Sequence, residues 1–419
     1  MLTRAPKGTN DITPEDSAKW RYIEDKINKI CFDYGFSEIR TPVFEHTELF
    51  ERGVGDTTDV VQKEMYTFND KGGRSITLRP EGTAGAARAF LERNIYAQPL
   101  PAKLYYNITC YRYEKPQAGR MREFHQFGAE CYGAEGPAVD AEVVMLAQKV
   151  LTSFGIPGLR LSINSIGCPK CRAEYNKALK EYFKGCYDSL CPTCQGRFEK
   201  NPLRILDCKS EVCKSLCEGA PMLLSYICDE CKGHFEGLKN YLEAADIPYS
   251  VDPTIVRGLD YYTKTVFEFK TNLPGTQGTV CGGGRYDGLI EELGGSHIPA
   301  VGFAMGIERI LLAMEEAGSM PDIDTDPDLF VATIGQKADL YSMKFIKRLR
   351  DEGVSVVRDY TDRSLKAQMK YADKTGAKFV IVLGESEIEQ GSARIKNMAT
   401  GEEREISLDD AAMAIKAVK

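Results

Sequence analysis

The sequence has few of the patterns that mark hydrolases, phosphate-binding loops or membrane proteins. Only four of its 419 residues are histidines, and none stands in an HxxxH or catalytic-triad spacing. It has no GxxxxGK[ST] loop and no GxGxxG segment that opens a helix, so two common phosphate-binding fingerprints are missing. No apolar run reaches the roughly 20 residues of a membrane helix, and the N-terminus lacks the apolar segment of a signal peptide. We therefore expect a cytoplasmic protein with no membrane contact.

The composition is that of a folded chain with more than one domain. Apolar residues make up 43% and charged residues 27% of the chain, as expected for a globular protein of this length. A helix-like run ends in Gly, Pro and Asp between 318 and 330, and strands and helices alternate after it. The sequence predicts an α+β domain over 1–325 with a mixed antiparallel sheet, and a small α/β domain over 326–419 with a mostly parallel sheet.

Charge is unevenly distributed along the chain. The net charge of −7 argues weakly against a nucleic-acid partner, but residues 337–378 hold 11 basic and 6 acidic side chains. A local excess of positive charge suits phosphate groups. A solvated helix face explains the same composition equally well.

Cysteine is concentrated in one segment that interrupts the first domain. Ten of the 14 cysteines lie between 168 and 231, inside a helical stretch that we place at about 166–242. Three CxxC pairs occur there, at Cys168 and Cys171, Cys191 and Cys194, and Cys228 and Cys231. In a reducing compartment such pairs favour metal ligation over disulfides, and two pairs complete a tetrahedral zinc site. The candidate zinc ligands are Cys168, Cys171, Cys191 and Cys194; buried cysteines that pack as small apolar residues are the alternative.

Residues 104–133 form a predicted β-hairpin with an unusual face, two strands joined by the loop KPQAGR. Alternation in a strand places Arg112, Glu114, Arg122, Phe124, Gln126 and Glu130 on one face, and Tyr111, Tyr113, Phe127, Ala129 and Cys131 on the other. Fixed charges of both signs around an aromatic ring suit a ligand that is anionic, cationic and planar in different parts. A nucleotide beside an amino acid fits this description.

The hairpin resembles motif 2 of the class II aminoacyl-tRNA synthetases, in which an Arg-x-Glu strand and a loop precede an arginine or histidine and a phenylalanine. The residues that match are Arg112, Glu114, Arg120 and Phe124. GFSEIRTPVFEHTELFERGVG (35–55) is similar to motif 1, which forms the dimer interface in that class. VGFAMGIERILLAM (301–314), with Arg309, is similar to motif 3. Each motif is degenerate alone, but their order along the chain is that of the class.

Two further peptides resemble the signature peptides of the histidyl-tRNA synthetases within this class. They are RGLDYYTKTVFEF (257–269) and CGGGRYDGLI (281–290), and the resemblance runs from KGTNDI near the start to the C-terminal α/β domain. It implies a class II antiparallel-sheet catalytic core with a helical insertion, followed by an α/β anticodon-binding domain. The cysteines of 166–242 are not part of the family's general pattern.

The resemblance implies the activity of a histidine–tRNA ligase. Such an enzyme joins the carboxylate of L-histidine to the α-phosphate of ATP, releases pyrophosphate, and then transfers histidine to the 3′ end of tRNA(His). The resemblance therefore implies ATP with Mg²⁺, tRNA(His) as the partner and a homodimer. Because phosphoryl transfer depends mainly on positioning and charge stabilisation, we expect cations around the phosphates.

The resemblance also assigns roles to individual residues. It places Arg112 at the α-phosphate and the carboxylate and Arg257 on the opposite side of the α-phosphate, as the candidate catalytic residues. It places Arg120 and Arg309 at the distal phosphates or adenine, Phe124 on the adenine ring and Glu114 at the adenine amino group. For histidine it gives Glu130 and Tyr262 to the imidazole, Glu81, Thr83 and Gln126 to the α-ammonium, and Tyr261 to the pocket wall. The imidazole needs two partners because both of its nitrogens must be satisfied once buried.

Purely structural roles would also account for several of these residues, and a second function fits the same core. Arg112 with Glu114 would form a structural ion pair, and Tyr261 and Tyr262 would be core aromatics. The rival function is that of a non-catalytic paralogue that senses histidine and regulates histidine biosynthesis. Such a protein lacks the anticodon-binding domain and has lost ATP-site arginines. This sequence has the four arginines and a complete C-terminal domain.

Overall fold

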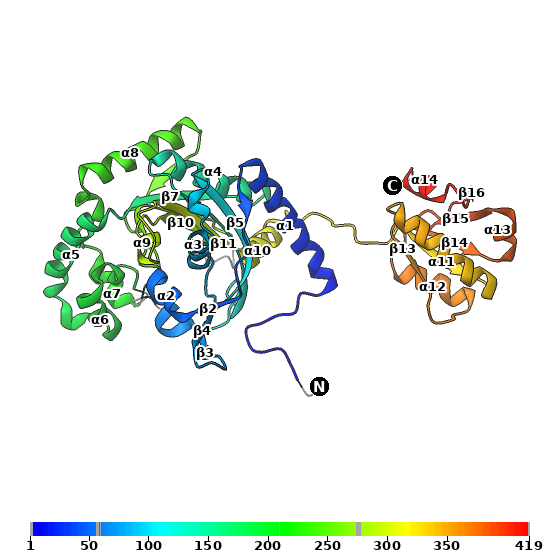
Figure 1. The fold of residues 1–419 in the computed structure, drawn as a ribbon, viewed down its shortest axis with the longest axis horizontal. Coiled ribbons are helices and arrows are strands. Elements are labelled where there is room, and N and C mark those ends of the chain that lie inside the picture. The colour runs from blue at the N-terminus through cyan, green and yellow to red at the C-terminus, as the bar shows by residue number, and fades with distance from the viewer. Residues whose placement is uncertain (1–2, 56–57, 59, 209, 274–277, 418–419) are drawn as a thin grey trace. The chain divides into compact units, whose positions relative to one another are not determined.

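The chain forms two compact units in the computed structural model, Met1–Pro321 and Asp322–Lys419 (Figure 1). The structure describes residues 3–55, 58, 60–208, 210–273 and 278–417. The predicted division between 325 and 326 falls in the segment between α10 (Ile307–Ala317) and β12 (Leu329–Thr333). Each unit has its own hydrophobic core. Within the described residues, none of the helices combines the length and the apolar character required to span a membrane.

An eight-stranded sheet forms the centre of the first unit. Its order is β1-β5-β6-β11-β10-β9-β7-β8, with parallel pairing of β1 with β5 and of β7 with β8 and antiparallel pairing elsewhere. The strands are β1 (Ser37–Glu38), β5 (Ala102–Tyr111), β6 (Glu123–Tyr132), β7 (Arg160–Ser165), β8 (Tyr249–Val251), β9 (Thr263–Lys270), β10 (Thr279–Arg285) and β11 (Ala300–Gly306). The predicted α+β core with an antiparallel sheet is confirmed.

Helices pack on one face of this sheet and leave part of the other face open. The packed face is covered by α1 (Pro14–Asp33), α4 (Pro137–Ser153), α8 (Asp229–Ala244) and α10. Strand residues such as Phe127 and Phe303 point into this core. On the other face, α3 (Thr83–Glu92) and α9 (Leu289–Glu292) contribute to a second core cluster, and Thr83 at the start of α3 lines a cleft.

Within its paired strands, the β5–β6 hairpin has the two faces that the alternation predicts. Arg122 and Tyr113, predicted on opposite faces, lie outside the strands, and the Arg122 guanidinium lies 3.9 Å from the Tyr113 ring centroid. The strands pair in register from Ala102 opposite Tyr132 to Tyr111 opposite Glu123. Phe127, Ala129 and Cys131 are buried in the core under α4, whereas Phe124 and Gln126 line the cleft. Arg112 and Glu114 follow β5, in the connection that leads to β6.

A smaller sheet is formed by residues 44–78 of the first unit. It has the order β2-β4-β3, built from β2 (Phe44–His46), β3 (Tyr66–Asn69) and β4 (Ser75–Leu78), and α2 (Thr47–Val54) follows β2. The segment 35–55, which the resemblance assigns to the dimer interface, thus contains β1, β2 and α2. Phe44 and Phe68 of this sheet are exposed.

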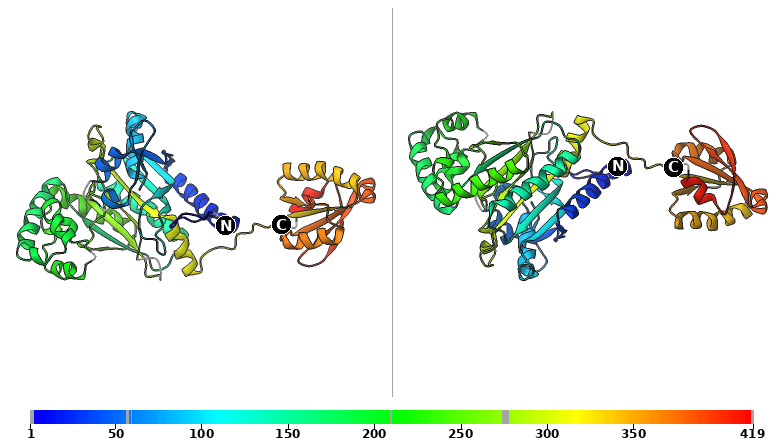
Figure 2. Two further views of the ribbon diagram at one scale, coloured as in Figure 1. Left: turned by 90° about the horizontal axis from the view of Figure 1, so that it is seen from below. Right: turned by 90° about the horizontal axis from the view of Figure 1, so that it is seen from above.

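The insertion consists of short helices at one end of the first unit (Figure 2). They are α5 (Pro169–Lys184), α6 (Pro192–Lys200) and α7 (Glu211–Cys217), joined by the 3₁₀ turns η3 (Tyr187–Ser189), η4 (Pro202–Ile205) and η5 (Leu223–Ser225), and they lead into α8. The first cysteine of each CxxC pair is a helix N-cap, Cys168 for α5, Cys191 for α6 and Cys228 for α8. The predicted helical insertion is confirmed.

The second unit is an α/β domain, as predicted, but its sheet is mixed. The order is β13-β12-β14-β15-β16, with β12 parallel to β13 and β14 and the last two pairings antiparallel. The remaining elements are α11 (Gln336–Asp351), β13 (Val356–Arg358), α12 (Leu365–Lys374), β14 (Phe379–Leu383), α13 (Glu385–Gln390), β15 (Ser392–Asn397), β16 (Glu403–Ser407) and α14 (Ala411–Lys416). The β15–β16 hairpin adds the antiparallel half, so the sheet is not mostly parallel.

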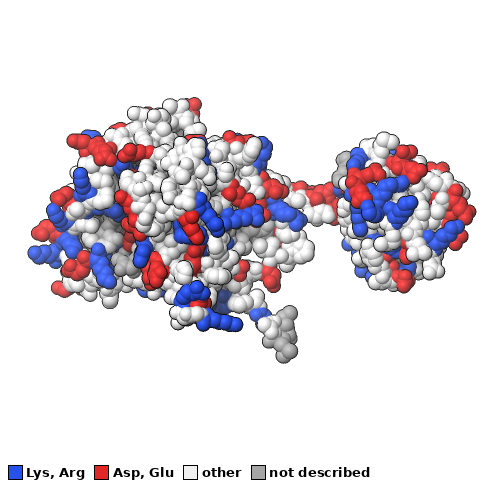
Figure 3. All heavy atoms as spheres, in the orientation of Figure 1, with Lys and Arg blue, Asp and Glu red and all other residues white. Residues whose placement is uncertain are grey.

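Basic and acidic side chains are intermixed on the face of the second unit shown in Figure 3. Not all basic side chains of 337–378 are available at the surface. Arg358 is buried, donates to Ser342 Oγ at 2.7 Å and pairs with Asp339. Lys366 and Lys370 on α12 are exposed, so they are better candidates than Arg358 for contacts with a phosphate backbone.

Candidate active site

A cleft of ≈ 630 Å³ lies on the open face of the large sheet. Its lining includes eleven of the twelve residues that the resemblance assigns to ATP and histidine, namely Glu81, Thr83, Arg112, Glu114, Arg120, Phe124, Gln126, Arg257, Tyr261, Tyr262 and Arg309. These residues come from segments as far apart as β4–α3 and α10. The fold therefore brings together side chains that are scattered over most of the first unit.

The twelfth residue, Glu130, lies behind the cleft wall. Its carboxylate accepts a hydrogen bond from Tyr106 Oη at 2.8 Å and another from Tyr286, which itself lines the cleft. Burial raises the pKa of Glu130 to about 8, although its hydrogen bonds act in the opposite direction. Gly302 on β11 is its cross-strand neighbour, and a Cβ atom there would lie 1.8 Å from Glu130 Oε2. Only a residue without a side chain leaves room for this carboxylate.

The turn between β4 and α3 supplies a second buried carboxylate. Glu81 accepts the backbone N–H of Thr83 at 2.7 Å and that of Ala84 at 2.8 Å, and so satisfies two free donors at the start of α3. Burial raises the pKa of Glu81. The neighbouring Gly82 N–H donates to Gln126 Oε1 at 2.9 Å. These bonds fix one acidic and one amide side chain at the same end of the cleft.

Three tyrosines form an aromatic wall next to Glu130. The ring centroid of Tyr261 lies 4.7 Å from that of Tyr262 and 5.4 Å from that of Tyr286. Tyr261 and Tyr262 directly precede β9, so the residues at the entrance of this strand turn their rings toward the cleft. The wall has apolar ring faces and hydroxyl groups, which suits a planar ligand that also needs hydrogen bonds.

Arg257 approaches the cleft from the segment between β8 and β9. Its guanidinium forms an ion pair with Glu268 on β9 and lies 5.8 Å from the Tyr262 ring centroid. A Cβ atom at Gly282 would lie 2.3 Å from Arg257 Nη2. Any side chain at this position of β10 would therefore clash with the guanidinium. Arg257 Nε is buried and has no hydrogen-bond partner among the described residues. A half-buried guanidinium with an unpaired, buried donor is expected to bind an anion.

The rest of the cleft is lined by arginines, beginning with Arg112 beside the β4–α3 turn. Arg112 Nε donates to Pro80 O at 2.8 Å, and the guanidinium lies 5.4 Å from the Phe124 ring centroid. Arg120 Nη1 lies 3.2 Å from Glu114 Oε2. Arg309 Nη1 donates to Thr279 O at 2.6 Å. Burial and the nearby Arg120 guanidinium lower the pKa of Arg309, which indicates positive charge that an anionic ligand would balance.

The arrangement is polarised along the cleft. Carboxylates and tyrosines at one end suit a ligand with a cation and a planar polar ring, and arginines with Phe124 at the other end suit phosphates and an aromatic base. Arg257 lies where the two ends meet, beside Tyr262. Such a cleft can hold two substrates with their reacting groups together.

Sequence reasoning missed several residues at this site. Tyr106 and Tyr286 hold Glu130, and Glu268 holds Arg257. Alternation along β9 would have found Glu268, because Phe267 and Phe269 on either side are buried in the core. No local signal indicates Arg204 and Asp207 of the insertion, which also line the cleft.

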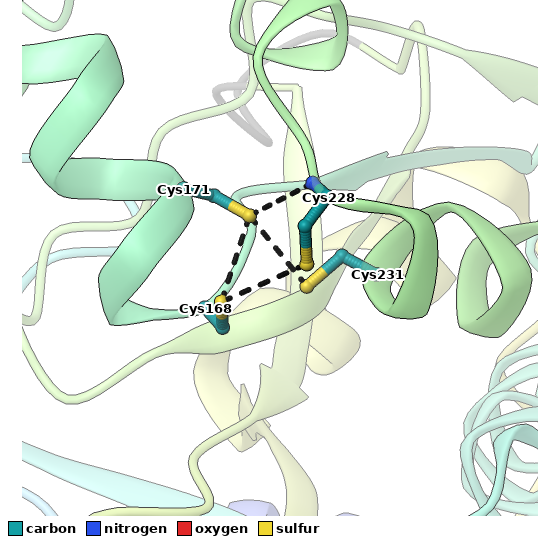
Figure 4. Close-up of side chains that lie close together, drawn as sticks. All are labelled: Cys168, Cys171, Cys228 and Cys231. Atoms are coloured by element: carbon teal, nitrogen blue, oxygen red, sulfur yellow. Dashed lines mark hydrogen bonds between the residues drawn. The ribbon is translucent and has the colours of Figure 1, made fainter.

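The predicted zinc ligands belong to two different groups of cysteines. Cys168 and Cys171 at the start of α5 face Cys228 and Cys231 at the start of α8 (Figure 4). Cys191 and Cys194 instead group with Cys208 and Cys213. Cys168, Cys171, Cys191 and Cys194 therefore do not form one ligand set, because each CxxC pair is brought to a different second pair by the fold. In each group the four Sγ atoms lie within 4.8 Å of one another, an arrangement that can hold structural zinc.

Comparisons with known proteins agree with this architecture. Residues 8–171 and 220–310 match the family model of histidyl-tRNA synthetase, and residues 328–418 match the model of an anticodon binding domain. The chain is 59% identical to the histidine–tRNA ligase of Acetivibrio thermocellus over 98% of each chain. It is 56% identical to that of Caldanaerobacter subterraneus subsp. tengcongensis, covering 99% of this chain and 100% of the relative. The crystal structure of apo S. aureus histidyl-tRNA synthetase is similar with a TM-score of 0.85 and 44% identity, covering 99% of this chain and 100% of that one.

Proposed function

Because this chain belongs to the histidyl-tRNA synthetase family, we propose that the cleft activates L-histidine with ATP and then transfers it to tRNA(His). The chain acts as a histidine–tRNA ligase, a class II aminoacyl-tRNA ligase. The observation that carries the assignment of the cleft is that the cationic, aromatic and acidic residues of the family's motifs line one cavity. The regulatory alternative is not favoured, since the four ATP-site arginines and the anticodon-binding domain are all present.

In the first step the carboxylate oxygen of histidine attacks the α-phosphorus of ATP and pyrophosphate leaves. Arg112 and Arg257 approach the reacting phosphate from opposite sides and stabilise the negative charge that grows on its oxygens. Arg257 suits this role because its Nε is buried and has no hydrogen-bond partner among the described residues. The ion pair with Glu268 holds the guanidinium in place.

The rest of ATP lies at the arginine end. Phe124 stacks on adenine, Glu114 accepts from the adenine amino group, and Arg120 and Arg309 bind the distal phosphates. Mg²⁺ bound together with ATP would help to neutralise the phosphate charge beside Arg120 and Arg309. The cation–π contact between Arg112 and Phe124 supports this orientation, because it places the phosphate-binding guanidinium next to the adenine platform.

Histidine occupies the tyrosine end. The two imidazole nitrogens pair with Glu130 and Tyr262, and the α-ammonium is bound by Glu81, Thr83 and Gln126. Tyr106 and Tyr286 each donate a hydrogen bond to Glu130 and so fix the orientation of its carboxyl group. Gln126 Oε1 accepts Gly82 N–H at 2.9 Å and the weaker Cys110 Sγ–H at 3.9 Å, and these bonds fix the Gln126 side chain.

The second unit binds the anticodon arm of tRNA(His), with Lys366 and Lys370 as candidate phosphate contacts. The enzyme acts as a homodimer through the segment 35–55. Phe44 (57% exposed) and Val43 (42% exposed) support this interface, because a partner would remove both apolar side chains from water.

Histidine-dependent exchange between ATP and labelled pyrophosphate tests the first step. The full-length chain and a chain that ends near Asp326 should both catalyse exchange, because the cleft lies within the first unit. Only the full-length chain should charge tRNA(His) at a normal rate. Absence of histidine-dependent exchange in the full-length chain would overturn the proposed use of the cleft.

A further inference from the structure

The insertion holds cysteines that the ligase reaction does not use. We propose that it binds two zinc ions, one in each group of four thiolates. The first site consists of Cys168, Cys171, Cys228 and Cys231, and the second of Cys191, Cys194, Cys208 and Cys213. We further propose that the ion in the second site positions the segment that carries Arg257 in the substrate cleft.

The spacing of the sulfur atoms in the first site fits one zinc ion. Cys168 Sγ lies 3.5 Å from Cys171 Sγ, and Cys171 Sγ lies 3.8 Å from Cys231 Sγ. Four thiolates at the usual zinc–sulfur distance of about 2.3 Å stand about 3.8 Å apart in a tetrahedron. A disulfide would bring two sulfurs to about 2.0 Å. A four-iron cluster would separate them further, because each thiolate would bind a different iron.

The second site has the same character. Cys191 Sγ lies 3.8 Å from Cys208 Sγ, and Cys194 and Cys213, both buried, complete the group. The backbone N–H of Cys191 donates to Cys213 Sγ at 3.3 Å, as that of Cys228 does to Cys171 Sγ at 3.1 Å in the first site. Backbone donors aimed at sulfur stabilise the thiolates that a zinc ion requires.

The first site joins the two ends of the insertion. Its ligands lie where the chain leaves β7 for α5 and where it returns at α8, whose residues Phe235 and Leu238 pack in the core of the first unit. An ion there closes the loop 172–227 at its base. Two of the helices inside this loop are short, nine residues for α6 and seven for α7, and helices of this length are marginal without tertiary support.

The second site lies beside the substrate cleft. Cys191 and Cys208 themselves line the cleft, and the ligands enclose the segment 195–207. Within it, Arg204 is 4% exposed and donates to the carbonyl oxygen of Arg257 at 3.0 Å. Asn201 Nδ2 donates to Asp260 Oδ1 at 3.2 Å. An ion in the second site therefore fixes two side chains that hold the peptide 257–260, so Arg204 is a positioning residue for Arg257.

Metal analysis of protein purified without chelator tests the two sites. The wild-type chain should contain two zinc ions, and C171S and C213S should each contain one. C186S is the matched control, because Cys186 lies in the insertion outside both groups, and it should retain two. Wild-type protein that carries no zinc, one zinc or iron would overturn the proposal.

Cobalt replacement provides a test that needs no variant. Wild-type protein produced with Co²⁺ should show the intense thiolate-to-metal and visible bands of tetrahedral tetrathiolate cobalt, at two ions per chain. Spectra of octahedral cobalt, or no bound cobalt, would contradict four thiolate ligands at each site.

A double-mutant cycle tests the route from the second ion to Arg257. C213S and R204M should each lower the maximal rate of pyrophosphate exchange at least tenfold with little change in the KM for histidine, and the double variant should be no slower than the worse single one. R204M should keep two zinc ions. Additive losses would overturn the route through Arg204.

The route to Arg257 rests on the proposed function, whereas the metal content does not. Wild-type protein with two zinc ions and no exchange would therefore overturn only the proposed function.

Discussion

The substrate cleft and the cysteine insertion are organised by different means. In the cleft, strand alternation places Phe124 and Gln126 of β6 on the cleft side, and core residues such as Phe127 lie on the opposite face of the sheet. In the insertion, the N-termini of α5 and α8 bring together cysteines that are distant in the chain, such as Cys168 and Cys228, 60 residues apart. A sheet can position a site by regular geometry alone, whereas in this helical segment the proposed zinc ions would cross-link distant residues.

The largest expected effect comes from removing metal from the insertion. A strong zinc chelator in the presence of a mild thiol reagent should expose residues 172–227 to protease while the large sheet stays intact, because structural zinc contributes on the order of 10 kcal/mol to such segments. Limited proteolysis with mass mapping of the cut sites measures this. Equal loss of protection in the sheet and the insertion would show that the two regions are not organised separately.

Arg257→Ala should strongly lower the rate of the reaction in the cleft and leave the structure of the insertion unchanged. Loss of a preorganised charge donor lowers transition-state stabilisation by about 2 to 4 kcal/mol, so pyrophosphate exchange should fall roughly 30- to 1,000-fold with near-normal histidine affinity. Arg257→Lys should recover only part of this, since an ammonium cannot reproduce the guanidinium fork. A large rise in histidine Kd with unchanged exchange at saturation would assign Arg257 to binding instead.

Tyr262→Phe should have a smaller effect, confined to histidine recognition. The variant leaves one imidazole nitrogen without a partner, which costs about 1 to 3 kcal/mol. The KM for histidine in pyrophosphate exchange should rise while the KM for ATP stays close to that of the parent. Unchanged histidine binding would show that the hydroxyl is not one of the two imidazole partners.

Glu130 makes the stability of the cleft depend on pH. Burial raises its pKa to about 8 in the folded protein, above the ordinary value, so the stability that this carboxyl contributes is fully present below the unfolded pKa and is lost as pH rises through about 8. As pH rises from 5 to 8, the free energy of unfolding of the parent should fall by about 1.4 kcal/mol per pH unit relative to that of Glu130→Gln. Denaturant titrations of both proteins without ligand measure the difference. Parallel curves for the two proteins would contradict a protonated Glu130.

Much of the cleft is predictable because its signals are local. Alternation in 104–133 separates Phe124 and Gln126 from Phe127 and Ala129, and the structure places them on the expected faces. The roles of individual residues toward ATP and histidine remain predictions. Tyr106 and Tyr286 were missed because they reach Glu130 from another strand and from a loop, a relation that only the tertiary fold creates.

The insertion and the second unit show why other features were not predictable. Cys208 and Cys213 have no CxxC spacing, so nothing in the sequence pairs them with Cys191 and Cys194. Counting charges likewise does not reveal that Arg358 is buried against Asp339. The second cysteine group and the Arg358–Asp339 pair depend on contacts between residues that are distant in the chain. Short-range sequence patterns carry no information about such contacts.

The missing side chain at Gly302 constrains how this protein can change. A Cβ atom there would lie 1.8 Å from Glu130 Oε2, so even alanine would displace the carboxylate that we propose as an imidazole partner. Under the proposed function, amino-acid selectivity depends partly on an atom that must be absent. A change of specificity by single substitutions would therefore have to preserve this glycine.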